Sequence, residues 1–313
     1  MKRLWPVALV AVLAACSGSE KDGEGSSAKL RGDACYQNDD LEGAVKAYTE
    51  AIAEDPNAMA PRNNRGNAYA RLGQADKAIA DFDKAVELAP DDARPRTNRG
   101  WSWRQKSDLS KARADLDEAV KLDPKSQLAV YRRGMVRWAQ NDIEGAEGDF
   151  KMATILNAQS AHAWAALAEL RVRKNAMDAA LEAANEGLKI NAGHAGLLNA
   201  RGLAWYAKKD FAKANDDFSA AITADADHRN ARFNRALISC ELKKYKEAIA
   251  DLDEAIRLAP KNPDSWKLRG YAKYAAGMGD DAVPDYKKAL EVAPKDWPDR
   301  KEVEEWLKKE PPK

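Results

Sequence analysis

The sequence shows no excess of charge of either sign, few cysteines and none of the short motifs that mark common catalytic sites. Lys and Arg number 51 and Asp and Glu number 50 among 313 residues, without a block of like charge. This balance argues against a nucleic-acid-binding surface and against an acidic tail. No GxSxG, HExxH, GxxxxGKS/T or CxxC motif and no EF-hand loop occurs. The sequence therefore predicts no enzyme, no cofactor and no metal site.

The N-terminal apolar run is too short to cross a bilayer as a helix. It extends from Leu4 to Ala15 and has 12 residues, whereas a spanning helix needs about 20. The run follows Lys2 and Arg3 and precedes Cys16 and a stretch rich in Ser and Gly. This order is typical of a signal peptide, which we place at residues 1–15.

The end of this segment, "LAAC" at Leu13 to Cys16, resembles the lipobox of bacterial lipoproteins. The resemblance implies that residues 1–15 are removed, that Cys16 is acylated, and that residues 16–24 form a short linker from the membrane. More than one acyl chain gives stable attachment. Ser17 stands where the family's signal for inner-membrane retention is usually Asp. We therefore expect an outer membrane lipoprotein that faces the periplasm, if the source is Gram-negative.

The sequence contains an internal repeat of 34 residues. Eight consecutive blocks run from Gly25 to Asp296 without an insertion or deletion. Position 20 is Ala in all eight blocks, position 27 is Ala in seven, and position 8 is Gly or Ala throughout. Small residues at fixed helical places mark points where two helices approach closely. A polar break near the middle of each block and Pro at position 32 in five of them indicate a helix, a turn and a second helix.

This pattern resembles the tetratricopeptide repeat, with small residues at positions 8, 20 and 27, a large residue at 24 and Pro at 32. The resemblance implies an all-α fold, a right-handed superhelical solenoid of eight helical hairpins over residues 25–296. The first helix of each hairpin would line a concave surface. Residues 297–313 are expected to form a capping helix and tail, with Val303, Trp306 and Leu307 on its apolar side. Cys35 and Cys240 fall in repeats one and seven, so both are expected to be free.

Two charged positions vary together among the repeats. Position 7 is Arg in seven blocks and position 23 is Asp in six, while block five has Leu167 and Ala183 instead. This pattern predicts an ion pair between the two helices of each hairpin, unless both positions are simply solvated. The predicted pairs are Arg65–Asp81, Arg99–Asp115, Arg133–Asp149, Arg201–Asp217, Arg235–Asp251 and Arg269–Asp285.

By the same resemblance, positions 5, 9 and 12 face the concave groove. Position 9 is usually polar in the family but is apolar or aromatic in five blocks here. Exposed apolar patches usually mark partner sites, which predicts an apolar groove for a protein or peptide. Aromatic residues at positions 5 and 12 could equally be packing residues between repeats. The predicted groove residues are Trp101, Tyr131, Met135, Trp138, Leu203, Tyr206, Phe233, Leu237, Tyr271 and Tyr274.

Other sites are not supported by the sequence. The family's carboxylate clamp is missing, because Lys29 occupies position 5 of repeat one but Asp33 occupies position 9. His162, His194 and His228 lie near one rim of repeats five and six. Successive repeats separate them, so no metal site is expected there, although an accessory of a hydrolase could use such a rim.

Together these features predict a lipid-anchored, non-catalytic scaffold that binds a protein or peptide partner in envelope assembly. Pilus, secretion and peptidoglycan machinery are all compatible with this interpretation, and the chain resembles envelope lipoproteins such as the pilotins of type IV pili. The alternative is a structural lipoprotein that self-associates, with the groove of one copy closed by a second copy. Neither interpretation involves nucleic acid.

Overall fold

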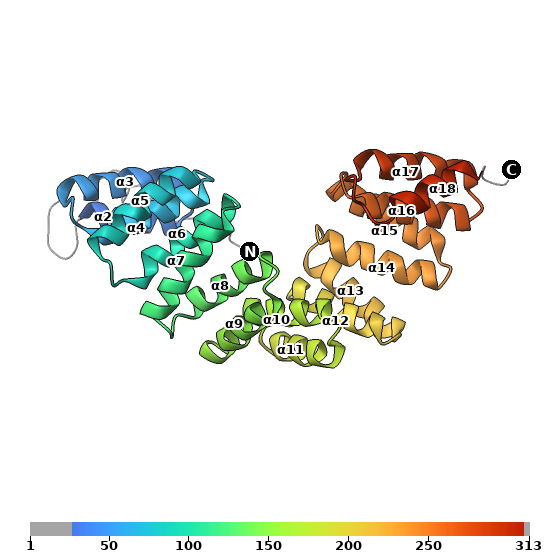
Figure 1. Ribbon diagram of the computed structural model, residues 1–313, viewed down its shortest axis with the longest axis horizontal. Coiled ribbons are helices and arrows are strands. Elements are labelled where there is room, and N and C mark those ends of the chain that lie inside the picture. The colour runs from blue at the N-terminus through green and yellow to red at the C-terminus, as the bar shows by residue number, and fades with distance from the viewer. Residues whose placement is uncertain (1–26, 310–313) are drawn as a thin grey trace, which may run out of the picture. The chain divides into compact units, whose positions relative to one another are not determined.

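The computed structural model describes residues 27–309, which form 17 helices and no strand. The predicted signal peptide, Cys16 and the linker before Ser27 lie outside the described residues. The described part divides into two compact units, which meet in sequence between Asn157 and Ala158 (Figure 1). Within residues 27–309, no helix is both long and apolar enough to cross a membrane.

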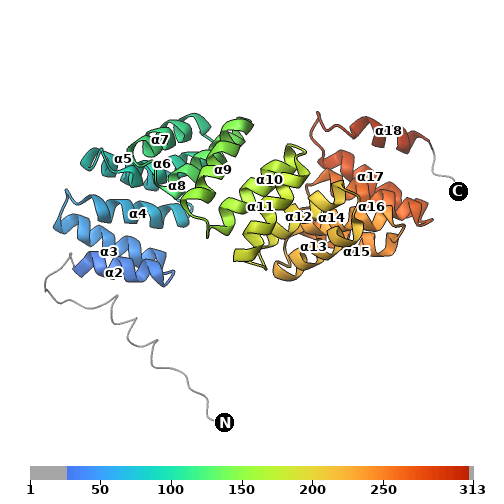
Figure 2. The same ribbon diagram turned by 90° about the horizontal axis from the view of Figure 1, so that it is seen from below.

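The first unit consists of four helical hairpins. Each helix contacts the next helix along the chain, and each first helix also contacts the first helix of the next hairpin (Figure 2). The helices are α2 Ser27–Gln37, α3 Leu41–Glu54, α4 Met59–Arg71, α5 Ala75–Leu88, α6 Ala93–Gln105, α7 Leu109–Leu122, α8 Gln127–Ala139 and α9 Ile143–Leu156.

The second unit contains four more hairpins and one further helix. Its helices are α10 Ala161–Arg173, α11 Met177–Ile190, α12 Ala195–Ala207, α13 Phe211–Ala224, α14 Arg229–Glu241, α15 Tyr245–Leu258, α16 Pro263–Ala275, α17 Gly279–Val292 and α18 Arg300–Lys308. From α4 to α17 every first helix has 13 residues and every second helix has 14, and equivalent helices begin 34 residues apart. The predicted all-helical repeat fold is confirmed.

The turn inside each hairpin is the same in all eight repeats. Position 15 has a positive φ in every one, and it is Gly in only two of them, Gly73 and Gly277. In repeat two, the N–H of Gln74 donates to the carbonyl oxygen of Tyr69 at 2.9 Å, and the N–H of Gly73 donates to that of Ala70. These bonds satisfy carbonyl groups at the end of the first helix and reverse the chain direction within three residues.

A close approach at position 8 joins the two helices of each hairpin. A Cβ atom added to Gly66 would lie 2.6 Å from the ring of Phe82, and one added to Gly202 would lie 2.6 Å from the ring of Phe218. Both phenylalanines occupy position 24 and are fully buried. Since such distances are below van der Waals contact, an aromatic ring at position 24 requires Gly at position 8.

Helix α18 covers the apolar end of the last hairpin. Val303 is 1% exposed and lies in a cluster with Tyr286, Ala289 and Trp297. The ring of Trp306 lies 4.2 Å from that of Tyr286, between ring centroids. The end of the repeat stack is thereby kept from water, as a terminal repeat requires.

The six position-7 arginines that have an aspartate at position 23 all form bidentate ion pairs with it. In repeat two, the Nε and Nη2 atoms of Arg65 each donate to a carboxylate oxygen of Asp81 at 2.7 Å. The six aspartates are buried, and the hydrogen bond to Asp81 raises the pKa of Arg65. The other pairs have the same geometry, with both oxygens of Asp115, Asp149, Asp217, Asp251 and Asp285 engaged.

The remaining Nη1 atom of each arginine donates to the preceding repeat. Its acceptor is always at position 25, sixteen residues earlier, as in the 2.8 Å bond from Arg99 to Asp83. A single side chain therefore connects three helices, two in its own repeat and one in the repeat before. The other acceptors are Thr49, Asp117, Asn185, Ser219 and Asp253.

Removing one carboxylate is expected to destabilise the first unit measurably. Asp115→Asn should lower the free energy of unfolding by about 2 kcal/mol, because the half-buried guanidinium of Arg99 loses its buried, bidentate carboxylate and keeps only the exposed Asp83. Glu118→Gln is the control on the same helix, since its pair with Lys121 is exposed and contributes less than about 1 kcal/mol. Denaturant unfolding of both variants measures the difference. Equal losses would mean that the Arg99–Asp115 pair contributes no more than a solvated one.

Candidate partner-binding face

The candidate site lies on the side of the first helices that points away from the second helices. We call it the first-helix face and define it by repeat positions 2, 5, 6, 9, 12 and 13. The second helices approach the first helices along position 8 and leave part of the side chains at these positions exposed. None of the ten predicted groove residues is fully buried, and Tyr271 and Tyr274 are 46% and 36% exposed.

Several aromatic residues at positions 5 and 12 also have packing partners inside their own unit. The rings of Tyr131 and Trp138 lie 5.9 Å and 6.0 Å from that of the buried Phe150. Tyr206 lies 5.6 Å from Phe211. These side chains thus have a structural role, which the sequence left open for positions 5 and 12.

The packing of the remaining groove residues varies. Leu203 packs on the core around Phe218, and Phe233 packs on the core around Leu252. The ring of Tyr274 lies 5.3 Å from that of Trp306 on α18. At position 9, Trp101, Met135, Leu203 and Leu237 are half-buried and Tyr271 is exposed. Position 9 therefore offers apolar surface to a partner in both units.

The face also contains polar side chains that the sequence analysis missed. In the first unit, Asn98 donates from Nδ2 to Oδ1 of Asn63 at 3.0 Å, and Arg132 donates from Nη1 to Oδ1 of Asn98 at 2.8 Å. Asn64 and the hydroxyl of Tyr48 both donate to Asp33. The predicted apolar groove is therefore a mixed surface. In the sequence, this polar character is indicated by the asparagines at positions 5 and 6, which become neighbours when the repeats stack.

A pocket of about 170 Å³ lies on this face in the first unit. Trp101 lines it, and the guanidinium carbons of Arg104 and Arg132 lie 4.6 Å and 5.3 Å from the centre of its ring. Both distances are within the range of cation–π attraction. The other lining residues include Tyr36, Asn67, Arg71, Asn98 and Gln105.

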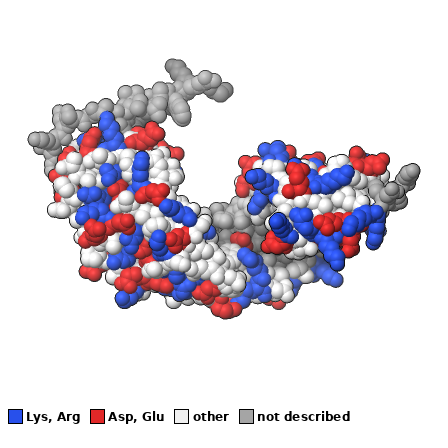
Figure 3. Space-filling view, turned by 45° about the horizontal axis from the view of Figure 1, so that its top comes forward, with Lys and Arg blue, Asp and Glu red and all other residues white. Residues whose placement is uncertain are grey.

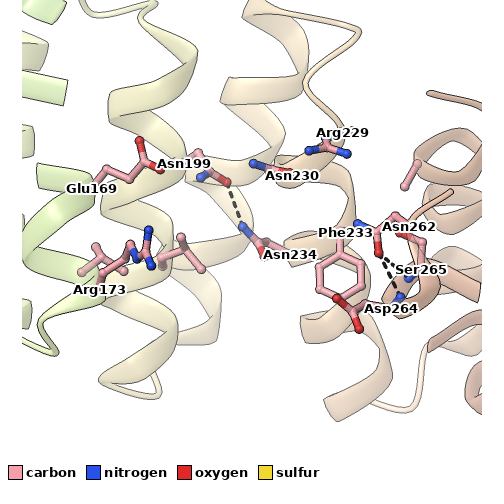
Figure 4. A pocket seen from close by; sticks show the side chains of 13 residues that line it. Glu169, Arg173, Asn199, Arg229, Asn230, Phe233, Asn234, Asn262, Asp264 and Ser265 are labelled. Carbon is pink, nitrogen blue, oxygen red and sulfur yellow. Dashed lines mark hydrogen bonds between the residues drawn. The ribbon is translucent and has the colours of Figure 1, made fainter. Parts of the chain in front are cut away.

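A second pocket, of about 230 Å³, lies on the same face in the second unit (Figure 4). Asn234 donates to Asn199 at 2.9 Å, in the same register as Asn98 and Asn63. Burial raises the pKa of Glu169, and the positive charge of Arg173 on the same helix opposes this rise. The pocket also holds Asn230, Phe233, Asn262 and Asp264.

Two of the three histidines act as helix caps. The Nδ1 atom of His194 accepts a hydrogen bond from the N–H of Leu197, and that of His228 accepts one from Ala231. These two histidines thus cap the N-termini of α12 and α14, and each ring carries its proton on Nε2. His162 lies 5.2 Å from His194 between ring centroids. Among residues 27–309, no group of three His, Cys, Asp or Glu side chains is arranged to hold a metal ion.

Charges of both signs are mixed on the side of the molecule that the space-filling view draws (Figure 3). Figure 3 shows Lys and Arg interspersed with Asp and Glu on the visible face of both units. Cys35 and Cys240 are buried and are not joined in a disulfide, and burial raises the pKa of Cys240 to about 11. A raised pKa keeps this thiol protonated and unreactive near neutral pH.

Comparison with known proteins gives a consistent family. Profiles of the tetratricopeptide repeat match residues 62–92, 97–160, 131–195 and 199–263, and a profile described as a TPR repeat matches residues 32–73. The matches to one of these profiles cover more than half of the chain.

Two curated relatives come from Saccharomyces cerevisiae. The small glutamine-rich tetratricopeptide repeat-containing protein 2 is 33% identical over 86 residues, which are 28% of this chain and 25% of that protein. Heat shock protein STI1 is 31% identical over 93 residues, which are 29% of this chain and 16% of that protein. The matches thus span a quarter or less of the length of these relatives.

Two solved structures have a similar fold. In the crystal structure of the APC/C hetero-tetramer Cut9–Hcn1, the TM-score is 0.71 at 16% identity, over 90% of this chain and 55% of that chain. For a tetratricopeptide repeat protein from Parabacteroides merdae, it is 0.62 at 17% identity, over 80% of this chain and 97% of that chain. At such low identity these likenesses show the fold alone.

The His194 cap makes the second unit sensitive to acid. Burial and, secondarily, the neighbouring bases His162 and His228 lower the pKa of His194 from 6.5. The folded state therefore takes up a proton less readily than the unfolded chain. Stability is complete above the unfolded pKa and should fall as the pH drops through 6.5 and then through the lower folded pKa.

His194→Asn should flatten this pH dependence, because Asn caps a helix without titrating. Denaturant unfolding from about pH 7.5 to about pH 5 measures the stability of both proteins. The difference between them isolates His194 from carboxylates that titrate at lower pH. Parallel curves would contradict a role for this cap.

Proposed function

Because this chain belongs to the tetratricopeptide repeat family, we propose that it is a non-catalytic scaffold that binds a protein or peptide segment along the first-helix face. The observation that carries this proposal is the composition of the two pockets on that face. Each combines half-exposed apolar or aromatic side chains with carboxamides and a few charged groups. Such a mixture suits a polypeptide, which presents apolar side chains and regularly spaced backbone polar groups.

The asparagine pairs suit the backbone of an extended segment. A carboxamide has two N–H donors and two acceptor lone pairs. In the pair Asn234–Asn199, one N–H and one oxygen lone pair are used, and these fix the orientation of both groups. Both carboxamides are largely buried but line the pocket, so a peptide there would meet the atoms that the pocket exposes. Because both side chains are already ordered, binding costs less conformational entropy than it would for free side chains.

The comparisons support a binding role in a general way. The Cut9–Hcn1 structure is an assembly of two different proteins, so a fold of this kind is compatible with partner binding. No reaction is suggested by the names of the similar proteins.

We also propose that the scaffold is anchored to the envelope through Cys16. The support is the order of features in the sequence, a basic start, an apolar run, "LAAC" and a small, polar linker. Ser17 favours the outer membrane in a Gram-negative source. A scaffold in that place would face the periplasm, where pilus, secretion or peptidoglycan machinery could supply the partner.

Charging the first-helix face should abolish partner binding. Met135→Asp with Leu237→Asp places one carboxylate on the face of each unit at position 9 and should reduce recovery of a specific partner from envelope extract at least about tenfold. Ile155→Asp is the control, since Ile155 is 74% exposed on the second helix α9.

Circular dichroism establishes that the double variant and the control keep their helical content. Unchanged recovery by the double variant would move the partner site away from the first-helix face. Light scattering of the same proteins tests the alternative of self-association, which predicts that the double variant alone changes mass.

Replacing the predicted acylation site should release the protein from the membrane. Cys16→Ser removes the thiol that would carry the first acyl chain, and a soluble or unprocessed product is expected in cell fractionation. Incorporation of labelled palmitate into the unmodified chain, and not into the variant, is the direct measurement. A variant that still sediments with membranes and still incorporates label would exclude Cys16 as the anchor.

A further inference from the structure

Two arginines in the first unit share one tryptophan and have no carboxylate partner. The guanidinium carbons of Arg104 on α6 and Arg132 on α8 both lie within 5.3 Å of the ring centre of Trp101. Neither forms an ion pair with any residue of the first unit, and the Nε atom of Arg104 is buried without a hydrogen-bond partner. The two charges repel each other, and the indole ring offsets only part of this cost.

Arg132 is held in place by neutral groups. Its Nη1 atom donates to Oδ1 of Asn98 at 2.8 Å and to the carbonyl oxygen of Thr97 at 3.2 Å. Burial lowers the pKa of this guanidinium to about 10, so it remains charged at neutral pH in surroundings that disfavour its charge. Both of these bonds use Nη1, so the other N–H groups of the Arg132 guanidinium point away from these two acceptors.

The carboxylates nearby are already used. On the same face, Asp33 accepts from Lys29, Tyr48 and Asn64. Asp39 forms an ion pair with Arg71. The position-7 arginines of the same unit also have their own acids. On this face of the first unit, Arg104 and Arg132 are thus the cations whose charge no carboxylate neutralises.

The geometry points to an acidic protein segment as the ligand of the first unit. Asp or Glu side chains of the segment would pair with Arg104 and Arg132, and an apolar side chain beside them would pack on Trp101. This inference rests on the proposed function and adds the chemistry of the partner. The acids are internal side chains, because two cations spread around one indole suit two carboxylates on neighbouring residues better than a single terminal one.

The second unit does not have the same preference. Its pocket holds the carboxylates of Glu169 and Asp264 together with Arg173 and Arg229. An acidic segment would meet like charge there, which costs affinity. The two units therefore share one scaffold and one asparagine register but differ in the charge that they accept.

A random peptide library displayed on phage tests the inference without a prior choice of ligand. The purified chain is compared with Arg104→Gln/Arg132→Gln, with Arg132→Lys, and with Lys121→Gln, an exposed cation on the second helix α7 that serves as control. Peptides enriched on the unmodified chain and on the control should carry two or more Asp or Glu close to an aromatic or aliphatic residue. This enrichment should disappear for the double variant and persist in part for Arg132→Lys, which keeps the charge.

Fluorescence titration then uses the most enriched peptide with an amidated C-terminus. Replacing its acidic residues by Asn and Gln, or using the double variant, should each weaken binding by about tenfold or more at low salt, and raised salt should reduce the difference. Enriched peptides without acids, or acidic peptides that bind the double variant equally, would overturn the inference while leaving the proposed function standing. A binding loss on amidation alone would assign the arginines to a terminal carboxylate instead. Failure to enrich any peptide would count against both proposals.

Discussion

The structure depends on the close contact between the two helices of each hairpin at position 8. Because the ring of Phe82 or Phe218 fills the space beside Gly66 or Gly202, the second helix can lie on one side of the first helix only. The opposite side is then left without a covering helix in every repeat. A steric constraint of one Cβ atom thus determines both where the core lies and which positions can meet a partner.

The arginine at position 7 links this contact within one repeat to the packing of successive repeats. It joins two helices of its own repeat and one of the preceding repeat, so the repeats are held in the register that brings position 5 of one beside position 6 of the next. The Asn98–Asn63 and Asn234–Asn199 bonds are consequences of that register. In repeat five, the buried apolar residues Leu167 and Ala183 replace the ion pair. Replacing a desolvated pair by apolar residues of suitable size need not cost stability.

The fold and the hairpin pairs could be predicted from the sequence because both recur at the same position in many repeats. The site could be predicted only in part. The periodic pattern does not reveal the roles of Asn98, Arg132 and the histidine caps. Asn98 and Arg132 bond to residues about 34 positions away, and each histidine cap bonds to a free backbone N–H. Aromatic residues were predicted as groove residues, but Tyr131 and Trp138 also pack against Phe150, since one ring can serve the core with one face and the groove with the other.

A repeated scaffold separates stability from specificity. The residues that hold the hairpins together are nearly constant along the chain at positions 7, 8, 20 and 23, and position 24 is large in seven of the eight repeats. Positions 5, 6, 9 and 12 differ from repeat to repeat. A change at the latter positions alters charge or shape on the open face without disturbing the contact that builds the hairpin. The uncompensated arginines beside Trp101 follow from this freedom. Their charge costs stability that the core contacts of four hairpins can supply, and the structure of the first unit keeps the two guanidinium groups ordered before any ligand arrives.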